Sequence, residues 1–253
     1  MPALSVCPES QDWHLLAHEW ACRLALPLVD HSPRHGLVLG IGPEGLALSD
    51  ADAPREQPLR VDFVEGALGY RQRQGFRKDE LLAKAVGIKS GWRPKVFDAT
   101  AGLGRDAFML ASLGCDVTLC ERHPVVHALL EDGLRRAASA PELAPVLDRM
   151  HLLAFDALGY MDQWPEDGMV DVIFLDPMFP ERGKSALVKK PMRLFHALVG
   201  ADEDADSLLD LALRHAGKRV VVKRPLHSGV LAGRAPQVVY KGKAVRFDVY
   251  LAA

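Results

Sequence analysis

The sequence has few cysteines, no long apolar run and almost no net charge. Four cysteines in 253 residues are too few for the disulfide framework of a small secreted protein. No apolar stretch approaches the roughly 20 residues that a membrane helix needs. The first residues, MPALSVCPESQDW, lack the basic start and apolar core of a signal peptide. We therefore expect a cytoplasmic protein that makes no membrane contact.

The charge balance excludes a whole-protein attraction to nucleic acid. The chain has 31 Lys and Arg against 33 Asp and Glu, a formal net charge of −2. Any binding of RNA phosphates must therefore use local basic segments. Two such segments are RQRQGFRK and ERGKSALVKKPMR, and a solvated charged face is the alternative for each of their residues. The candidate RNA-binding residues are Arg71, Arg73, Arg77, Lys78, Arg182, Lys184, Lys189, Lys190 and Arg193.

The first 93 residues predict a small unit and a connector. In residues 1–65, a small N-terminal α/β subdomain, the stretch WHLLAHEWACRLAL has helical spacing, and GLVLGIGPEGLALSD predicts two strands around a turn. The stretch LRVDFV alternates like a third strand. Residues 66–93 predict a basic connector whose second half is helical.

Residues 94–253 alternate between strands and helices, which is typical of a parallel sheet covered on both faces. Strands are predicted at KVFDAT, DVTLCE, MHLLAFD, VDVIFLD and KRVVVKRP, with a helical region at 184–216. QVVYKGKAVRFDVYLA predicts a closing antiparallel hairpin. An α/β sheet of this kind binds ligands at the carboxyl ends of its strands.

The first of these strand ends is rich in glycine. In DATAGLGRDA, Gly102 and Gly104 allow a tight turn before a helix N-terminus. Glu121 closes the second strand about 20 residues later, where an acid accepts hydrogen bonds from ribose hydroxyls. This pattern serves either NAD or another nucleoside cofactor.

Acidic residues favour a cationic nucleoside cofactor over a dinucleotide. Asp98 would repel a diphosphate but attract the ammonium and sulfonium charges of S-adenosylmethionine. Asp106 adds a second acid, although it could serve only the helix dipole. Phe155 and Asp156 end the third strand, where they suit an adenine ring and its amine.

The fourth strand ends in LDPMFPERGK. The Asp176 carboxylate can accept a hydrogen bond from an amino group, and Pro177 fixes the backbone so that neighbouring carbonyls can point at the same amine. Phe179 offers a ring on which a base can stack, worth about 1–3 kcal/mol. We predict that Asp176, Pro177 and Phe179 are the catalytic residues.

The sequence resembles the ribosomal RNA small subunit methyltransferase J family in four motifs: DATAGLGRDAF, CERHPVV, LDPMFPERGKSALVKK and KRVVVKRP. The resemblance implies a class I methyltransferase, with a Rossmann-like seven-stranded sheet, a C-terminal hairpin and S-adenosylmethionine as cofactor. It implies in-line methyl transfer to N2 of a guanine in 16S ribosomal RNA, with that RNA or the small subunit as partner. By this likeness the cofactor pocket would contain Arg105, Asp106, Glu121, Arg122, Phe155, Asp156 and Asp176. Met178 replaces the second proline of the loop that is typical of amine methyltransferases.

Three other functions remain open. A methyltransferase could act on adenine N6 or a protein amine, since the loop recognises an amino group more than a ring. An NAD-dependent oxidoreductase would use Gly102, Gly104 and Glu121 but leaves Asp98 without a role. A non-catalytic RNA-binding factor could keep the same scaffold. No metal is expected, because His14, His18 and Cys22 share a helix face without a fourth ligand.

Overall fold

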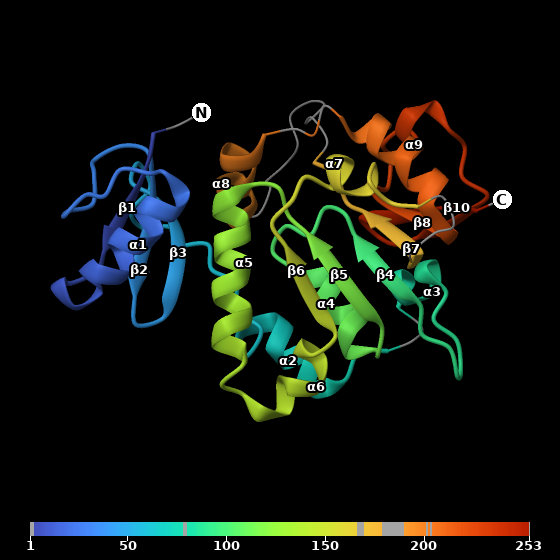
Figure 1. The fold of residues 1–253 in the computed structure, drawn as a ribbon, viewed down its shortest axis with the longest axis horizontal. Helices are drawn as coiled ribbons and strands as arrows, with labels where there is room; N and C mark the ends of the chain where they lie inside the picture. Colours follow the sequence, from blue (N-terminus) through green and yellow to red (C-terminus); the bar gives the residue numbers. More distant parts are fainter. Residues whose placement is uncertain are drawn as a thin grey trace.

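The computed structural model describes residues 3–77, 80–165, 170–178, 190–200, 202 and 204–252. It contains a large sheet of seven strands and a small sheet of three strands (Figure 1). The small sheet, built from the N-terminal residues, lies on one side of α5 (Pro124–Ala137), and the large sheet lies on the other (Figure 1).

The large sheet confirms the predicted α/β class. Its strand order is β6-β5-β4-β7-β8-β10-β9. The five parallel strands are β4 (Lys95–Asp98), β5 (Asp116–Cys120), β6 (Met150–Leu153), β7 (Val170–Leu175) and β8 (Ala216–Pro225). The predicted hairpin forms β9 (Val238–Lys241) and β10 (Val245–Leu251), and β10 runs antiparallel to β8. Within this sheet the chain begins with the central strand β4 and continues outward through β5 and β6. It then returns to form β7 on the other side of β4. The switch point of the sheet is thus between β4 and β7.

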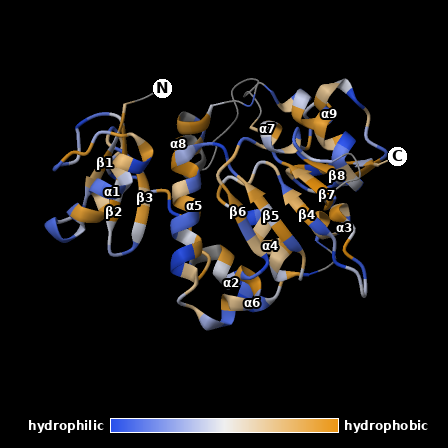
Figure 2. Cartoon of the chain, viewed as in Figure 1, coloured by the Kyte–Doolittle hydropathy of each residue, from blue (hydrophilic) through white to orange (hydrophobic). Residues whose placement is uncertain are grey.

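Alternating apolar residues bury both faces of this sheet. Val96 and Val172 belong to one core, whereas their neighbours Phe97 and Ile173 belong to the other. Figure 2 shows the resulting concentration of hydrophobic residues in the strands. The first core includes residues of α4 (Arg105–Ser112), α5 and α8 (Lys190–Val199), and the second includes residues of α7 (Ala157–Met161) and α9 (Ala205–His215). The short α6 (Ala144–Leu147) follows α5. None of the helices in the described part of the chain could cross a bilayer.

The N-terminal unit differs from its prediction in two strands. The predicted helix is α1 (His14–Leu24), and the predicted pair of strands is β2 (Leu37–Gly42) and β3 (Gly45–Asp50). A strand that was not predicted, β1 (Leu4–Pro8), pairs in parallel with β2. The strand predicted at LRVDFV is wrong, because only Leu59 bridges to Leu48. The Asp62 carboxylate then accepts the N–H groups of residues 64 and 65, both at 2.9 Å, which turns the chain.

The connector contains two helices. The predicted helix in its second half is α3 (Leu81–Val86), and α2 (Gly66–Gln74) occupies the first half, where no helix was predicted. The predicted division of the chain at residues 65 and 93 stays a prediction.

Candidate functional site

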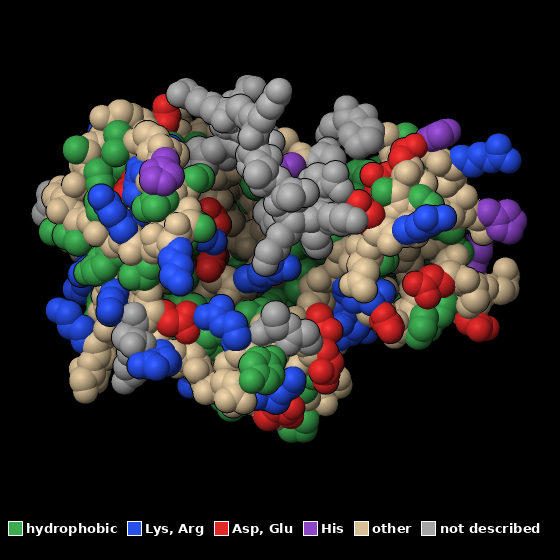
Figure 3. All heavy atoms as spheres, turned by 180° about the vertical axis from the view of Figure 1, so that it is seen from behind, with side chains coloured by type: hydrophobic (Ala, Val, Ile, Leu, Met, Phe, Trp, Pro, Cys, Tyr) green, Lys and Arg blue, Asp and Glu red, His purple; other side chains and the backbone are tan. Residues whose placement is uncertain are grey.

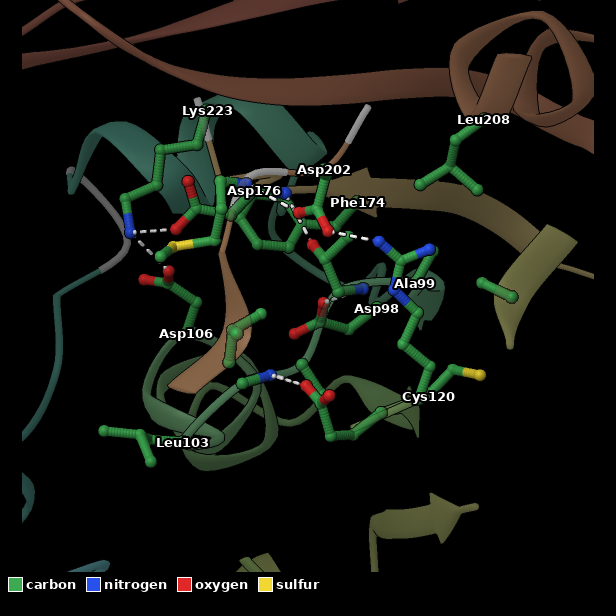
Figure 4. Close-up of a pocket in the computed structure, with 18 of the residues that line it drawn as sticks. Asp98, Ala99, Leu103, Asp106, Cys120, Phe174, Asp176, Asp202, Leu208 and Lys223 are labelled. Atoms are coloured by element: carbon green, nitrogen blue, oxygen red, sulfur yellow. Dashed lines mark hydrogen bonds and ion pairs between the residues drawn. The ribbon is translucent and has the colours of Figure 1, made fainter. Parts of the chain in front are cut away.

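A cavity of about 210 Å³ lies at the carboxyl ends of β4, β5 and β7 (Figure 4). It is the place where a sheet of this topology binds ligands. Most of the residues predicted to bind the cofactor line it: Asp98, Gly102, Arg105, Asp106, Glu121, Arg122, Asp156 and Asp176.

The glycine loop between β4 and α4 is fastened to the end of β5. The Gly102 N–H donates to Glu121 Oε2 at 2.8 Å, and Glu121 Oε1 accepts the His123 N–H at 2.7 Å. Gly104 has φ +71°, and a Cβ there would lie 2.7 Å from a methyl group of Leu130, so glycine is favoured at this position. Burial raises the pKa of Glu121, although the two N–H donors oppose this shift.

Asp176, the first residue after β7, is held from two sides. Its N–H donates to the Thr100 hydroxyl at 2.6 Å, and its Oδ2 accepts a hydrogen bond from Lys223 Nζ at 2.9 Å. Lys223 also donates to Asp106 Oδ2 at 2.7 Å, so one ammonium joins two carboxylates (Figure 4). Sequence reasoning missed Lys223, although the strand KRVVVKRP that carries it was predicted. Its position near the end of β8 was the available signal.

The pKa values of this ion-pair cluster shift in a consistent way. Burial raises the pKa of Asp176, while the nearby Lys223 charge lowers it. Burial alone would lower the pKa of Lys223, but the Asp176 and Asp106 carboxylates outweigh it, and the net shift is upward. Lys223 therefore stays protonated and favours the ionised form of Asp176.

Asp202, between α8 and α9, links Met178 after β7 to Arg122 after β5. Asp202 Oδ2 accepts the Met178 N–H at 2.7 Å, and the Asp202 N–H donates to the Met178 carbonyl at 2.9 Å. The Arg122 guanidinium donates to the carboxylates of Asp202 and Asp204. Arg122 thus lines the cavity with its charge engaged by acidic residues, and Asp202 is a second residue that sequence reasoning missed.

Comparisons with known proteins assign this chain to a family. A family model described as "Putative SAM-dependent methyltransferase" matches residues 20–252. The ribosomal RNA small subunit methyltransferase J of Pseudomonas paraeruginosa is 50% identical over 249 residues, which cover 98% of this chain and 95% of that protein. The chain belongs to this methyltransferase family.

Two further similar proteins support this family assignment. The protein of the same name from Thioalkalivibrio sulfidiphilus is 52% identical over 250 residues, covering 98% of this chain and 97% of its own. The crystal structure of the SAM-dependent methyltransferase NGO1261 from Neisseria gonorrhoeae has a TM-score of 0.71 at 35% identity, covering 98% of this chain and 96% of that one. The predicted class I methyltransferase fold is thereby confirmed, and S-adenosylmethionine, not NAD, is the cofactor.

The charges in the cavity fit this cofactor. Asp98, the last residue of β4, is only 1% exposed, and its Oδ1 accepts the Thr100 N–H at 3.2 Å. Burial raises the pKa of Asp98 well above its ordinary value, and the Asp106 charge raises it further. No cation in the described part of the chain is hydrogen-bonded to Asp98. The ammonium and sulfonium charges of S-adenosylmethionine would stabilise its carboxylate, as the sequence predicts.

Not every predicted site residue lies at the cavity. Phe155 is outside the lining, is 54% exposed and stacks on Tyr160 with ring centroids 5.5 Å apart. Pro177 is buried next to Asp176, and Phe179 lies outside the described residues. The roles of Phe155 and Phe179 stay predictions. No group of three metal-ligating side chains occurs among the residues described.

The predicted RNA-binding residues are only partly visible. Arg71 pairs with Glu80 at 2.7 Å, and Arg73 donates to the Val64 carbonyl at 2.7 Å. Arg77 follows α2. Figure 3 shows Lys and Arg side chains mixed with acidic ones on one face of the molecule. Lys78, Arg182, Lys184 and Lys189 lie outside the described residues, as do the side chains of Lys190 and Arg193 on α8.

Proposed function

We propose that this protein transfers a methyl group from S-adenosylmethionine to the exocyclic N2 amine of a guanine in 16S ribosomal RNA, in the cytoplasm. The observation that carries the proposal is the position of Asp176. Its carboxylate lines the cofactor cavity at the switch point of the sheet, where an amine can meet the methyl donor. The names of the relatives and the four sequence motifs support ribosomal RNA as the substrate.

Asp176 and Pro177, directly after β7, suit the binding of an amine as methyl acceptor. A guanine N2 amine is a weak nucleophile because its lone pair is delocalised into the ring. Asp176 accepts one amine hydrogen and the Pro177 carbonyl accepts the other, which fixes the lone pair toward the donor. S-adenosylmethionine, when bound, supplies a methyl group on a positively charged sulfur. As the new N–C bond forms, the bond between the methyl group and sulfur breaks and the sulfur leaves as a neutral thioether. The amine loses one proton in this step, and the Asp176 carboxylate takes that proton.

Lys223 contributes by keeping Asp176 ionised. A protonated Asp176 could neither accept the amine hydrogen nor take up the released proton. The ammonium at 2.9 Å opposes the rise in pKa that burial causes.

Replacing Asp176 by Asn or Ala tests the proposal. We expect methyl transfer to fall at least about 100-fold, since a general base contributes typically this much, while affinity for S-adenosylhomocysteine changes little. The measurements are labelled methyl transfer to small-subunit RNA or particles from cells that lack the enzyme, mapping of the modified base, and calorimetry with S-adenosylhomocysteine. Asp171→Asn, at the other end of β7, is the matched control.

Near-normal transfer by Asp176→Ala would refute the role of this carboxylate. A methyl group mapped to an adenine or to a protein amine would move the activity to that substrate.

A further inference from the structure

A second cavity, of about 470 Å³, adjoins the cofactor cavity. Its volume lies within the range of small-molecule sites. The two cavities share four lining residues: Leu103, Arg105, Asp106 and Lys223. The other walls come mainly from residues 60–65, which precede α2, and from Leu68 and Arg71 of α2.

We propose that this second cavity holds the acceptor nucleotide of a single RNA strand, with the base on its apolar wall and a phosphate on its arginines. The inference rests on the proposed function, since it places the substrate of that reaction.

The shared lining residues place the second cavity next to Asp176, the proposed catalytic carboxylate. Lys223 Nζ lies 2.7 Å from Asp106 Oδ2 and 2.9 Å from Asp176 Oδ2. Asp106 and Lys223 line both cavities, whereas Asp176 lines only the cofactor cavity. A flat ring that enters from the second cavity therefore meets the ion-pair cluster that holds Asp176. Its exocyclic amine can reach that carboxylate while the rest of the nucleotide stays outside the cofactor cavity.

The lining combines apolar and basic groups, as a nucleotide requires. Leu68, Leu103 and Met109 offer apolar surface to a base. Three arginines, Arg60, Arg71 and Arg105, offer charge to a phosphate.

Two of these arginines have unused hydrogen-bonding capacity. The Arg105 guanidinium is exposed and forms no hydrogen bond or ion pair with another residue that the structure describes. The guanidinium of Arg60 contacts Glu44, but its Nε is buried and has no partner among the described residues.

The acids of this cavity are engaged locally. The Asp62 carboxylate accepts two backbone N–H groups, and the Asp106 carboxylate accepts a hydrogen bond from Lys223 Nζ. The Glu65 carboxylate lies 3.9 Å from the guanidinium of Arg73, a residue that does not line the cavity. The cavity therefore favours an anion with a flat apolar part, which is the chemistry of a nucleotide.

Filling the cavity from α2 tests this inference. Leu68 lines the cavity and is half-buried, whereas Tyr70 on the same helix is 60% exposed and is not part of the lining. The variants are Leu68→Trp and, as control, Tyr70→Trp. The probe is a short uridine-rich oligoribonucleotide with one central guanosine, added to protein saturated with S-adenosylhomocysteine.

We expect Leu68→Trp to weaken oligonucleotide binding at least about tenfold, measured by fluorescence anisotropy. Tyr70→Trp should bind within about twofold of the unmodified protein, and affinity for S-adenosylhomocysteine should be unchanged in both variants. Arg105→Ala should reduce the slope of log affinity against log salt by about one, because one phosphate contact is lost. Leu68→Phe, a smaller change, replaces Leu68→Trp if circular dichroism shows that the latter is unfolded.

Unchanged oligonucleotide binding by a folded Leu68 variant would overturn the inference. The inference would also be overturned if the unmodified protein bound an oligonucleotide that lacks the central base as tightly as the one that contains guanosine. Displacement of the oligonucleotide by polyglutamate, with polyglutamate binding itself lost in the Leu68 variant, would assign the cavity to an acidic peptide instead. A protein that shows the expected binding losses but transfers no methyl group to RNA would refute the proposed function and leave the nucleotide site standing.

Discussion

At the scale of single residues, one ammonium controls the ionisation of the site. Asp98, Asp106 and Asp176 lie close enough that the charge of Asp106 raises the pKa of each of the other two. Without a cation these carboxylates would repel one another in a cavity that excludes much of the solvent. Lys223 bonds to Asp106 and Asp176 but not to Asp98. Asp98 is thus free of that ammonium, and we predict that the positive charges of the cofactor stabilise its carboxylate instead.

Replacing Lys223 by Met should shift the pH dependence of methyl transfer. Burial already raises the pKa of Asp176, and Lys223 opposes that rise. Removing the Lys223 ammonium lets the pKa of Asp176 rise further. As the solution is acidified, Asp176 therefore becomes protonated at a higher pH than in the unmodified protein. We expect the acid limb of kcat/KM to move to higher pH. Lys223→Arg keeps the charge and should leave the limb near its original place. The measurement is kcat/KM against pH for both variants, and coinciding acid limbs for Met and Arg would contradict this role.

The strand-end rule predicted the residues around the cavity but not their pairing. Strands with recognisable apolar residues end at or just before Asp98, Gly102, Glu121 and Asp176, and the topology of the sheet gathers strand ends at one edge. The partner of Asp176 is 47 residues further along the chain. No local pattern indicates that contact, because it depends on which strands are neighbours and how their side chains are oriented.

At the scale of elements, the parallel strands were predictable because they are buried on both faces and end in turn residues. The helix α2 was not, because Gly66 and Gly69 reduce helix propensity. A Cβ on Gly69 would lie 2.0 Å from the Val64 carbonyl oxygen, so this glycine serves a close packing that the sequence does not reveal. The strand β1 has only five residues, too few to show a clear period.

Asp202 should position residues 176–178 after β7. In Asp202→Ala, the Met178 N–H loses its side-chain acceptor and Arg122 loses one of its two main partners. Asp204→Ala removes a partner of Arg122 but leaves Met178 bound, so it is the matched control. We expect Asp202→Ala to lower kcat/KM about tenfold more than Asp204→Ala, because a displaced loop misplaces the acceptor amine. Kinetics with labelled cofactor measure this difference, and equal losses would assign the effect to Arg122 instead.

At the scale of the whole molecule, the small N-terminal sheet and the large sheet share a hydrophobic core. Leu39 of β2, Val61 and Phe108 of α4 belong to one apolar cluster. Phe63 stacks on Phe108 with ring centroids 4.8 Å apart. The segment that carries Val61 and Phe63 also lines the second cavity. The attachment of the N-terminal unit should therefore affect both stability and the shape of the proposed acceptor site.

Asp132 of α5 is the polar centre of this attachment. Its carboxylate is 2% exposed and accepts the Leu46 N–H of β3 at 3.0 Å. It also accepts Arg135 and Arg136, both at 2.8 Å, and Arg136 in turn donates to the Val61 carbonyl. Asp132→Ala leaves the buried Leu46 N–H without its acceptor and removes the carboxylate partner of Arg136, whose guanidinium keeps the Val61 carbonyl.

We expect Asp132→Ala to lower the free energy of unfolding by about 3 kcal/mol, the cost of breaking a buried pair. The neighbouring Glu131→Ala is the control, because Glu131 pairs with Arg23 near the surface, where both side chains are well exposed, and such a pair is worth about 0–1 kcal/mol. Urea unfolding of the two variants gives both values. Limited proteolysis should cut Asp132→Ala first near residues 51–58, where the N-terminal sheet joins the rest of the chain. Equal stability of the two variants would show that apolar packing alone attaches the N-terminal unit.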